Sequence, residues 1–150
     1  MANYYGTART SYFPITKEKL PAFEAYMEKL PGVHHEAGAE TVDGVQTYCL
    51  INDYESGFVM VWTYDDDTEE DTEIEPIQDI LEQFVTEPTA IFYVEAGAEK
   101  ARYVVGQAAL YTRDSAGQVT EEADMSVGNW VTRMMQDPRT DGLFQTAPEY

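Results

Sequence analysis

Carboxylates dominate the chemistry that this sequence offers, and a dense run of them spans Tyr64–Glu75, with the sequence YDDDTEEDTEIE. So many oxygen ligands suggest a calcium loop of the EF-hand type, which needs glycine at its sixth position and glutamate at its twelfth. Counted from Asp65, these positions hold Glu70 and Pro76, and a loop starting at Asp67 fails as well. We therefore expect no resident metal ion, and a loose divalent-ion binder stays a weaker alternative.

Histidine and cysteine chemistry is limited to three residues. His34 and His35 are neighbours, so in a strand they point to opposite faces and cannot chelate one metal ion. Cys49 is the single cysteine, which excludes an intramolecular disulfide, and its apolar neighbours predict a buried, inert thiol. The sequence also lacks a Gly-x-Ser-x-Gly elbow, a phosphate loop and a dinucleotide fingerprint. We expect no catalytic residue and no cofactor, with a small hydrolase as the weaker alternative.

Basic residues are missing from almost half of the chain. No lysine or arginine occurs between Lys29 and Lys100, whereas 18 of the 28 acidic residues lie from Glu36 to Glu99. The remaining 10 acidic residues are nearly balanced by the 9 basic ones, so this basic-free interval, residues 30–99, supplies almost all of the net charge of −19. Direct binding to nucleic acid or to an anionic membrane requires Lys and Arg, so both are excluded and a basic partner is expected.

Residue patterns divide the chain into strands and helices. Alternating β-favouring residues between turn signals predict strands at residues 5–13, 33–40, 45–52, 58–64, 90–94, 103–112 and 118–121. Apolar residues at helical spacing predict helices over residues 20–30, 76–84 and 126–136. Prolines fit this division, because Pro21 and Pro76 lie in the first turns of two helices and Pro138 follows the third.

Short connections between consecutive strands favour antiparallel pairing, and residues 45–52 and 58–64 are predicted to form a hairpin. The predicted fold class is α+β, with a mainly antiparallel sheet and about three helices packed on it. Residues 1–138 are expected to form a single acidic domain, followed by an irregular tail at 139–150. The start of the chain lacks the features of a signal peptide, and no apolar run is long enough to span a bilayer. We expect a cytoplasmic protein, and a homodimer is compatible with the sequence.

Four explanations of the charge remain open. A solvated acidic loop between a strand and a helix explains residues 65–75, but it does not explain the missing bases. Adaptation to high salt acts on a whole surface, whereas the charges outside the basic-free interval are nearly balanced. The third explanation is an interaction module for some basic protein, and the fourth is mimicry of nucleic acid.

Mimicry fits the amount of charge. Duplex DNA carries one negative charge per roughly 1.7 Å of its axis. A compact domain of 150 residues has a radius of gyration of about 15 Å, and hence a diameter of about 40 Å. A duplex of that length carries on the order of 20 phosphates, which is close to the charge of this chain.

In size, acidity and scarcity of bases, the chain resembles the small DNA-mimic inhibitors carried by phages and plasmids, among them antirestriction and anti-CRISPR proteins. Its opening, MANYYGTART, is also similar to the openings of proteins from mobile elements. The resemblance implies a non-catalytic inhibitor that blocks a DNA-binding protein, such as a restriction enzyme or a CRISPR complex. Because DNA mimics differ in fold, it transfers no functional residue by position.

The expected contact surface combines the acidic run with the polar face of the helix that follows it, where carboxylates are spaced i, i+4 and i+7. Its residues are Asp65, Asp66, Asp67, Glu69, Glu70, Asp71, Glu73, Glu75, Asp79 and Glu82. Tyr64, Trp62 or Tyr54 are candidate aromatic anchors at its rim. For Trp62, core packing within the 58–64 strand is the favoured alternative.

Overall fold

The computed structural model describes residues 4–41, 43–52, 58, 60–65, 70–99 and 103–123. Its elements are β1 (Tyr4–Thr10), β2 (Phe13–Pro14), α1 (Leu20–Met27), β3 (Val33–Glu40), β4 (Gln46–Asn52), β5 (Val61–Asp65), β6 (Glu70–Ile74), α2 (Pro76–Gln83), β7 (Thr89–Glu99), β8 (Tyr103–Arg113) and β9 (Val119–Ala123). The predicted α+β class with a mainly antiparallel sheet is confirmed. The described residues hold two helices rather than about three, and the helix expected over 126–136 and the tail at 139–150 lie outside them.

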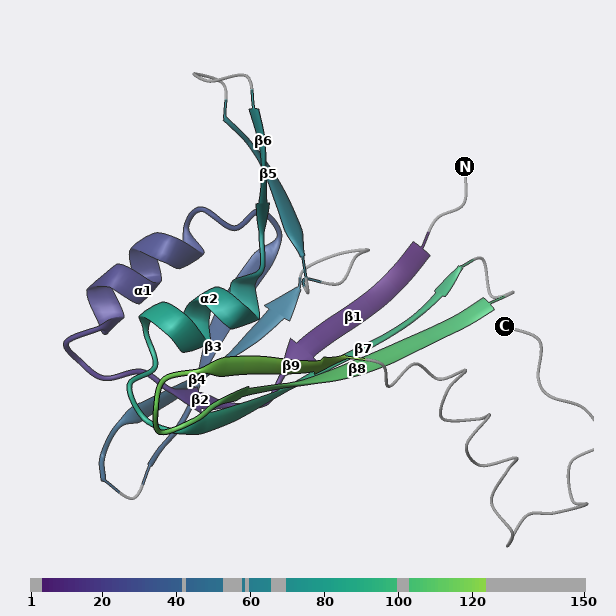
Figure 1. The fold of residues 1–150 in the computed structure, drawn as a ribbon. Coiled ribbons are helices and arrows are strands. Elements are labelled where there is room, and N and C mark those ends of the chain that lie inside the picture. Colours follow the sequence, from purple (N-terminus) through teal and green to yellow (C-terminus); the bar gives the residue numbers. More distant parts are fainter. Residues whose placement is uncertain are drawn as a thin grey trace, which may run out of the picture.

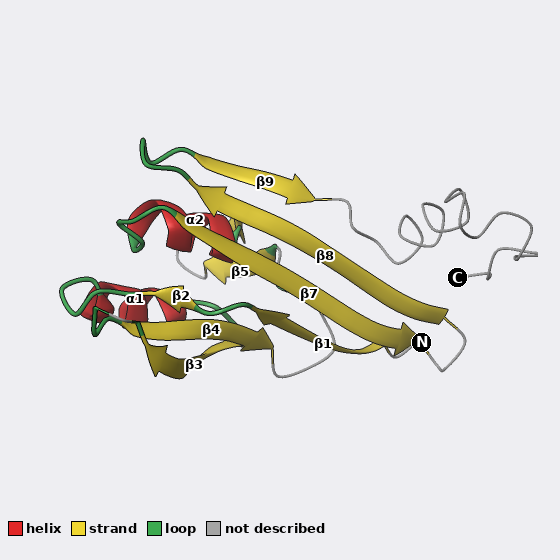
Figure 2. Ribbon diagram, turned by 90° about the horizontal axis from the view of Figure 1, so that it is seen from below, coloured by secondary structure: helices red, strands yellow, loops and turns green. Residues whose placement is uncertain are grey.

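The main sheet has the order β2-β4-β1-β7-β8-β9, with β3 added on the free side of β4, and its strand pairs are antiparallel (Figures 1 and 2). Its longest ladder joins β7 to β8, from Thr89 opposite Arg113 to Glu99 opposite Tyr103. The sequence predicted that β7 would stop at residue 94, before a stretch of small residues. The strand continues because residues 95–99 have partners on both sides, in β1 and in β8. Pairing on both edges outweighs their low strand propensity.

The predicted hairpin between residues 45–52 and 58–64 is wrong. A strand has two edges, and those of β4 are taken by β3 on one side and by β1 and β2 on the other. The next strand, β5, pairs instead with β6, from Val61 opposite Ile74 to Asp65 opposite Glu70. This two-stranded sheet projects from the body of the protein (Figure 1). Part of the acidic run is therefore a strand of a hairpin rather than a loop.

Both helices lie on one face of the main sheet, where they close the core (Figures 1 and 2). Helix α1 buries Phe23 and Met27, and α2 buries Ile77, Ile80 and Leu81, as their spacing predicted. The ring of Phe23 joins the two helices to the sheet through aromatic contacts, with centroid distances of 5.9 Å to Phe84, 6.1 Å to Phe13 and 5.5 Å to Tyr48. The predicted burial of Cys49 is confirmed.

Side chains along β7 show that only one face of the sheet carries these helices. Ile91 and Tyr93 are fully buried on the helix side, whereas Phe92 and Val94 are 46% and 52% exposed on the opposite side. Among the described residues, no helix is long and apolar enough to cross a membrane.

Candidate functional site

The β5–β6 hairpin presents two aromatic rings and two carboxylates on one of its faces. Trp62 lies opposite Glu73, and Tyr64 lies opposite Asp71. Residues that face each other across an antiparallel pair project to the same side, so these four side chains share one surface. All four are exposed, Trp62 by 59% and Tyr64 by 60%. We call this surface the hairpin face.

The other side of the hairpin attaches it to the core. Val61 is buried, and its partner Ile74 is partly buried against the core cluster. Alternation along each strand therefore divides the hairpin into an inner side at its base and an outer side in solvent. The alternative that Trp62 packs in the core is wrong, because the strand register turns this ring outward. Trp and Tyr are enriched at protein–protein interfaces, where one end of the side chain is apolar and the other is polar.

An open acidic pocket lies at the base of the hairpin, where β6 runs into α2. Its volume is about 320 Å³, and it is lined by Glu73, Ile74, Glu75, Gln78 and Asp79. Glu73 belongs to both the pocket and the hairpin face, so the two surfaces are continuous. Among the residues that the structure describes, no lysine or arginine lines the pocket. Carboxylates therefore set the charge of the whole surface.

The carboxylates of α2 and its N-cap differ in their exposure and in their hydrogen bonds. Glu75 and Glu82 are exposed as predicted, and Glu82 accepts a hydrogen bond of 2.9 Å from Gln78 Nε2. Asp79 is half-buried, and it accepts a hydrogen bond of 2.7 Å from the hydroxyl of Tyr26 on α1. Burial and this hydrogen bond raise the pKa of Tyr26 well above its ordinary value. Asp79 is thus fixed in place and links the two helices, besides lining the pocket.

The hairpin pairing places the two halves of the acidic run side by side. Asp65 and Glu70 pair through their backbones at the last described rung of the hairpin. Four further candidate residues lie outside the described part of the chain: Asp66, Asp67, Glu69 and the aromatic candidate Tyr54. Glu73, Glu75 and Asp79 line one pocket, and Asp71 shares the hairpin face with Glu73. Glu82 lies further along α2.

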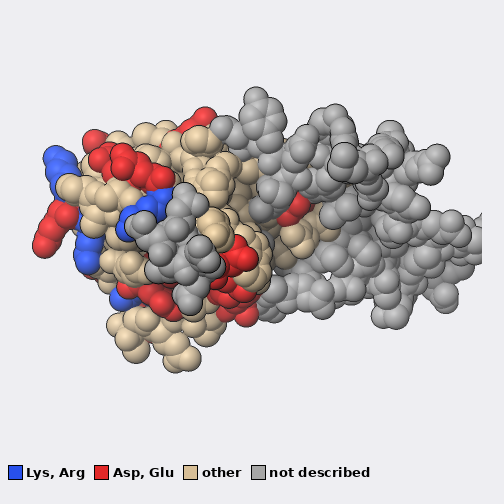
Figure 3. All heavy atoms as spheres, turned by 90° about the horizontal axis from the view of Figure 1, so that it is seen from above, with Lys and Arg blue, Asp and Glu red and all other residues tan. Residues whose placement is uncertain are grey.

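Viewed from the side to which the hairpin projects, the described surface carries several groups of carboxylates, and the Lys and Arg side chains lie toward one end (Figure 3). Lys19 Nζ donates a hydrogen bond of 3.2 Å to the backbone oxygen of Gln83, in the last turn of α2. A cation there complements the negative end of the helix dipole. The carboxylates at the hairpin base lie at the opposite, N-terminal end of α2.

Histidines and metal-binding groups add no second chemistry to this surface. His34 is exposed and His35 is half-buried, with its ring centroid 5.2 Å from that of Phe23, as expected for neighbours on opposite faces of a strand. Within the described ranges, no group of three or more His, Cys, Asp or Glu side chains is arranged to hold a metal ion.

Sequence reasoning found the acidic residues but missed the strand that organises them. The signal was an alternation on both sides of the tip: Trp62 and Tyr64 at spacing two, then Asp71 and Glu73 at spacing two. Acidic residues have low strand propensity, so residue types alone predict no strand over residues 70–74.

No protein-family model, curated protein sequence or solved structure matches this chain. What this surface can bind is therefore inferred from its geometry and charge alone.

Proposed function

We propose that this protein is a non-catalytic inhibitor whose hairpin face and acidic pocket occupy the DNA-binding surface of a basic protein. The target would be a component of a host defence system in the cytoplasm, such as a restriction enzyme or a CRISPR complex. The observation that carries the proposal is the outward display of Trp62 and Tyr64 beside Asp71 and Glu73 on a projecting hairpin, within an interval free of bases.

Each component of the surface has a role in such a complex. Carboxylates at alternate positions of a strand are spaced by about 6.8 Å, which is also the rise of two base-pair steps in DNA, at about 3.4 Å each. They would engage the Lys and Arg side chains that otherwise bind phosphates, and the opposite fields would accelerate the encounter. Exposed Trp and Tyr rings would supply buried area and cation–π contacts with the same basic residues.

A second candidate function is an interaction module for a basic protein that does not bind DNA. The exposed aromatic pair favours it equally, because Trp and Tyr are enriched where protein interfaces lose water. Under this function, the hairpin face is still the contact surface, but DNA does not compete for the partner.

The test replaces the charges of the hairpin face without altering its shape. In the double variant D71N/E73Q, we expect capture of the partner from a host lysate at low salt to fall about tenfold, as for the loss of roughly 1.4 kcal/mol of charge pairing. Both side chains are exposed, so we expect the melting temperature not to fall.

The matched control is E18Q/E87Q, which removes two exposed carboxylates away from the hairpin. It should retain full capture. Equal losses in both variants would indicate a general charge effect and would contradict a specific hairpin face. Unchanged capture by D71N/E73Q would reject the assignment of the site.

A further inference from the structure

Strand β3 lies at an edge of the main sheet. It pairs with β4, and no other strand among the described residues pairs with it. The direction of its free backbone groups follows from the contacts of β4. Leu50 N–H donates to Thr10 Oγ1, and Gln46 C=O accepts from Ile15 N–H, both on the side of β4 away from β3.

In an antiparallel strand, the N–H and C=O groups of one residue point to the same side. The backbone N–H and C=O groups of Leu50 point away from β3, so those of its partner His35 point away from β4. The same holds for Val33 and Ala37, two residues before and after His35. These three residues therefore present their backbone groups to the open edge. The regular register ends at a bulge between Ala37 and Glu40, so the available edge runs over residues 33–37.

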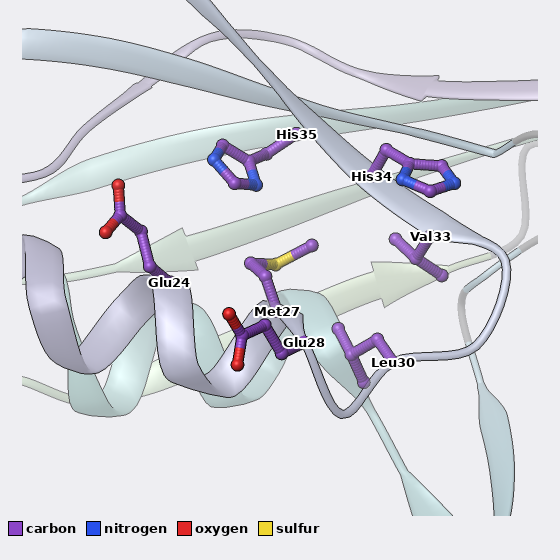
Figure 4. Close-up of a pocket in the computed structure, with 7 residues that line it drawn as sticks. All are labelled: Glu24, Met27, Glu28, Leu30, Val33, His34 and His35. Carbon is purple, nitrogen blue, oxygen red and sulfur yellow. The ribbon is translucent and has the colours of Figure 1, made fainter.

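A groove runs beside this edge, between β3 and α1 (Figure 4). Its volume is about 400 Å³. The floor is apolar, because Met27, Leu30 and Val33 line the groove and are buried. Its rim carries the exposed carboxylates of Glu24, on α1, and Glu28, the C-cap residue four positions later. His34 and His35 complete the lining on the strand side.

We propose that this groove binds an extended basic segment of a partner protein by strand addition. The segment pairs its backbone with Val33, His35 and Ala37, the groups that the edge leaves open. A Lys or Arg side chain of the segment lays its aliphatic stem on the apolar floor and places its cation between Glu24 and Glu28. The site is separate from the hairpin face and does not depend on the function proposed for it.

Charge decides which occupant fits. An acidic or neutral strand would leave the two rim carboxylates without a counter-charge. A second copy of this chain, paired edge to edge over residues 33–37, would bring the Glu36 carboxylates of the two copies to neighbouring positions of the joined strands, and each copy carries a net charge of −19. Like charges across a strand pair destabilise it. A basic segment satisfies both the open edge and the rim.

The experiment uses a labelled ten-residue peptide of alternating lysine and threonine as the probe, with alternating glutamate and threonine as the control. Binding is measured by fluorescence anisotropy, and backbone contact by amide hydrogen exchange of the full chain. We expect the lysine peptide to slow exchange at Val33, His35 and Ala37. We expect exchange at His34 and Glu36, which already face β4, to change little.

Variants separate this site from the hairpin. The double variant E24Q/E28Q should bind the lysine peptide roughly tenfold more weakly, because it removes two charge pairs. The hairpin variant D71N/E73Q should bind it normally, even if it loses the partner of the hairpin face. The proposal is overturned by equal binding of the glutamate peptide, by exchange changes that do not alternate along β3, or by concentration-dependent self-association protecting the same edge.

Discussion

At the scale of single residues, side-chain hydrogen bonds help to join β1 to β4. Among the described residues, these strands share one backbone register pair, Arg9 opposite Ile51. Side chains replace further backbone bonds there, since Leu50 N–H donates to Thr10 Oγ1 over 2.8 Å and Ala8 N–H donates to Asn52 Oδ1 over 2.7 Å. Thr10 is buried, so water cannot replace its hydroxyl as the acceptor for Leu50 N–H.

The substitution Thr10→Val keeps the shape of this side chain but removes its oxygen. Leu50 N–H then has no acceptor in a buried site, so we expect the free energy of unfolding to fall by about 2 kcal/mol. Urea denaturation measures the change. Thr7→Val, at an exposed position of the same strand, is the control and should change stability by less than about 0.5 kcal/mol. Equal stability of the two variants would contradict the role of Thr10.

The ionisation of three tyrosines makes the stability of the fold depend on pH. Burial, followed by a hydrogen bond to a carboxylate, raises the pKa values of Tyr26, Tyr93 and Tyr111 well above the ordinary 10.0. Below pH 10, these tyrosines are protonated in both the folded and the unfolded states, so they add no pH dependence. Above pH 10, they ionise in the unfolded chain but not in the folded one, and stability is lost as the pH rises.

We therefore expect alkaline unfolding to accompany the ionisation of these three tyrosines. The measurement follows tyrosinate absorbance and far-UV circular dichroism together across an alkaline titration. Part of the absorbance change should coincide with the loss of secondary structure. Complete ionisation of all tyrosines while the circular dichroism stays native would contradict the hydrogen bonds described for these three side chains.

At the scale of elements, turns were predictable because their chemistry is local. The segment Asp114–Gly117 has residue types that favour a turn, with aspartate first and glycine last, and Gly117 adopts a φ of 84° between β8 and β9. Asp114 Oδ1 accepts from the backbone N–H groups of Ala116 and Gln118, at 2.8 and 2.9 Å. A side chain that bonds the backbone of its own turn depends on no distant contact.

The substitution Gly117→Ala tests this turn. An alanine is strained at positive φ, and its Cβ would also lie 3.1 Å from the guanidinium of Arg113. We expect a loss of about 1 kcal/mol, measured by thermal unfolding. The comparison is Gly44→Ala, which has a similar φ of 76° but open space around its Cβ. A smaller loss at Gly44 would show the added cost of the Arg113 contact, whereas no loss at either position would contradict the strain.

Elements whose partners are distant in sequence were less predictable. The apolar faces of α1 and α2 followed from spacing alone, because helix burial repeats within one segment. The partner of β5 did not, since it depends on which edges of β4 are already occupied. For the same reason, the sequence listed the acidic residues of the candidate site but not the outward direction of Trp62 and Tyr64. Strand register decides that direction, and a shift of one residue would reverse it.

At the scale of the whole molecule, charge and shape act together. A net charge of −19 opposes compaction, and most of it comes from the basic-free interval that contains the hairpin and α2. The projecting hairpin holds exposed carboxylates away from the core cluster, and its inner side anchors it through Val61. The hairpin therefore presents part of this negative charge at a distance from the core, where a basic surface can bind it.

If this acidic surface takes the place of DNA, duplex DNA must compete with it for the partner. The immobilised protein captures its partner from a host lysate at low salt, and duplex DNA is then added at increasing concentration. We expect DNA-binding proteins to be released in proportion to the DNA added, and the same proteins to be lost when D71N/E73Q is immobilised instead. A partner that requires the hairpin face but stays bound in excess DNA would contradict mimicry and would support the second candidate function.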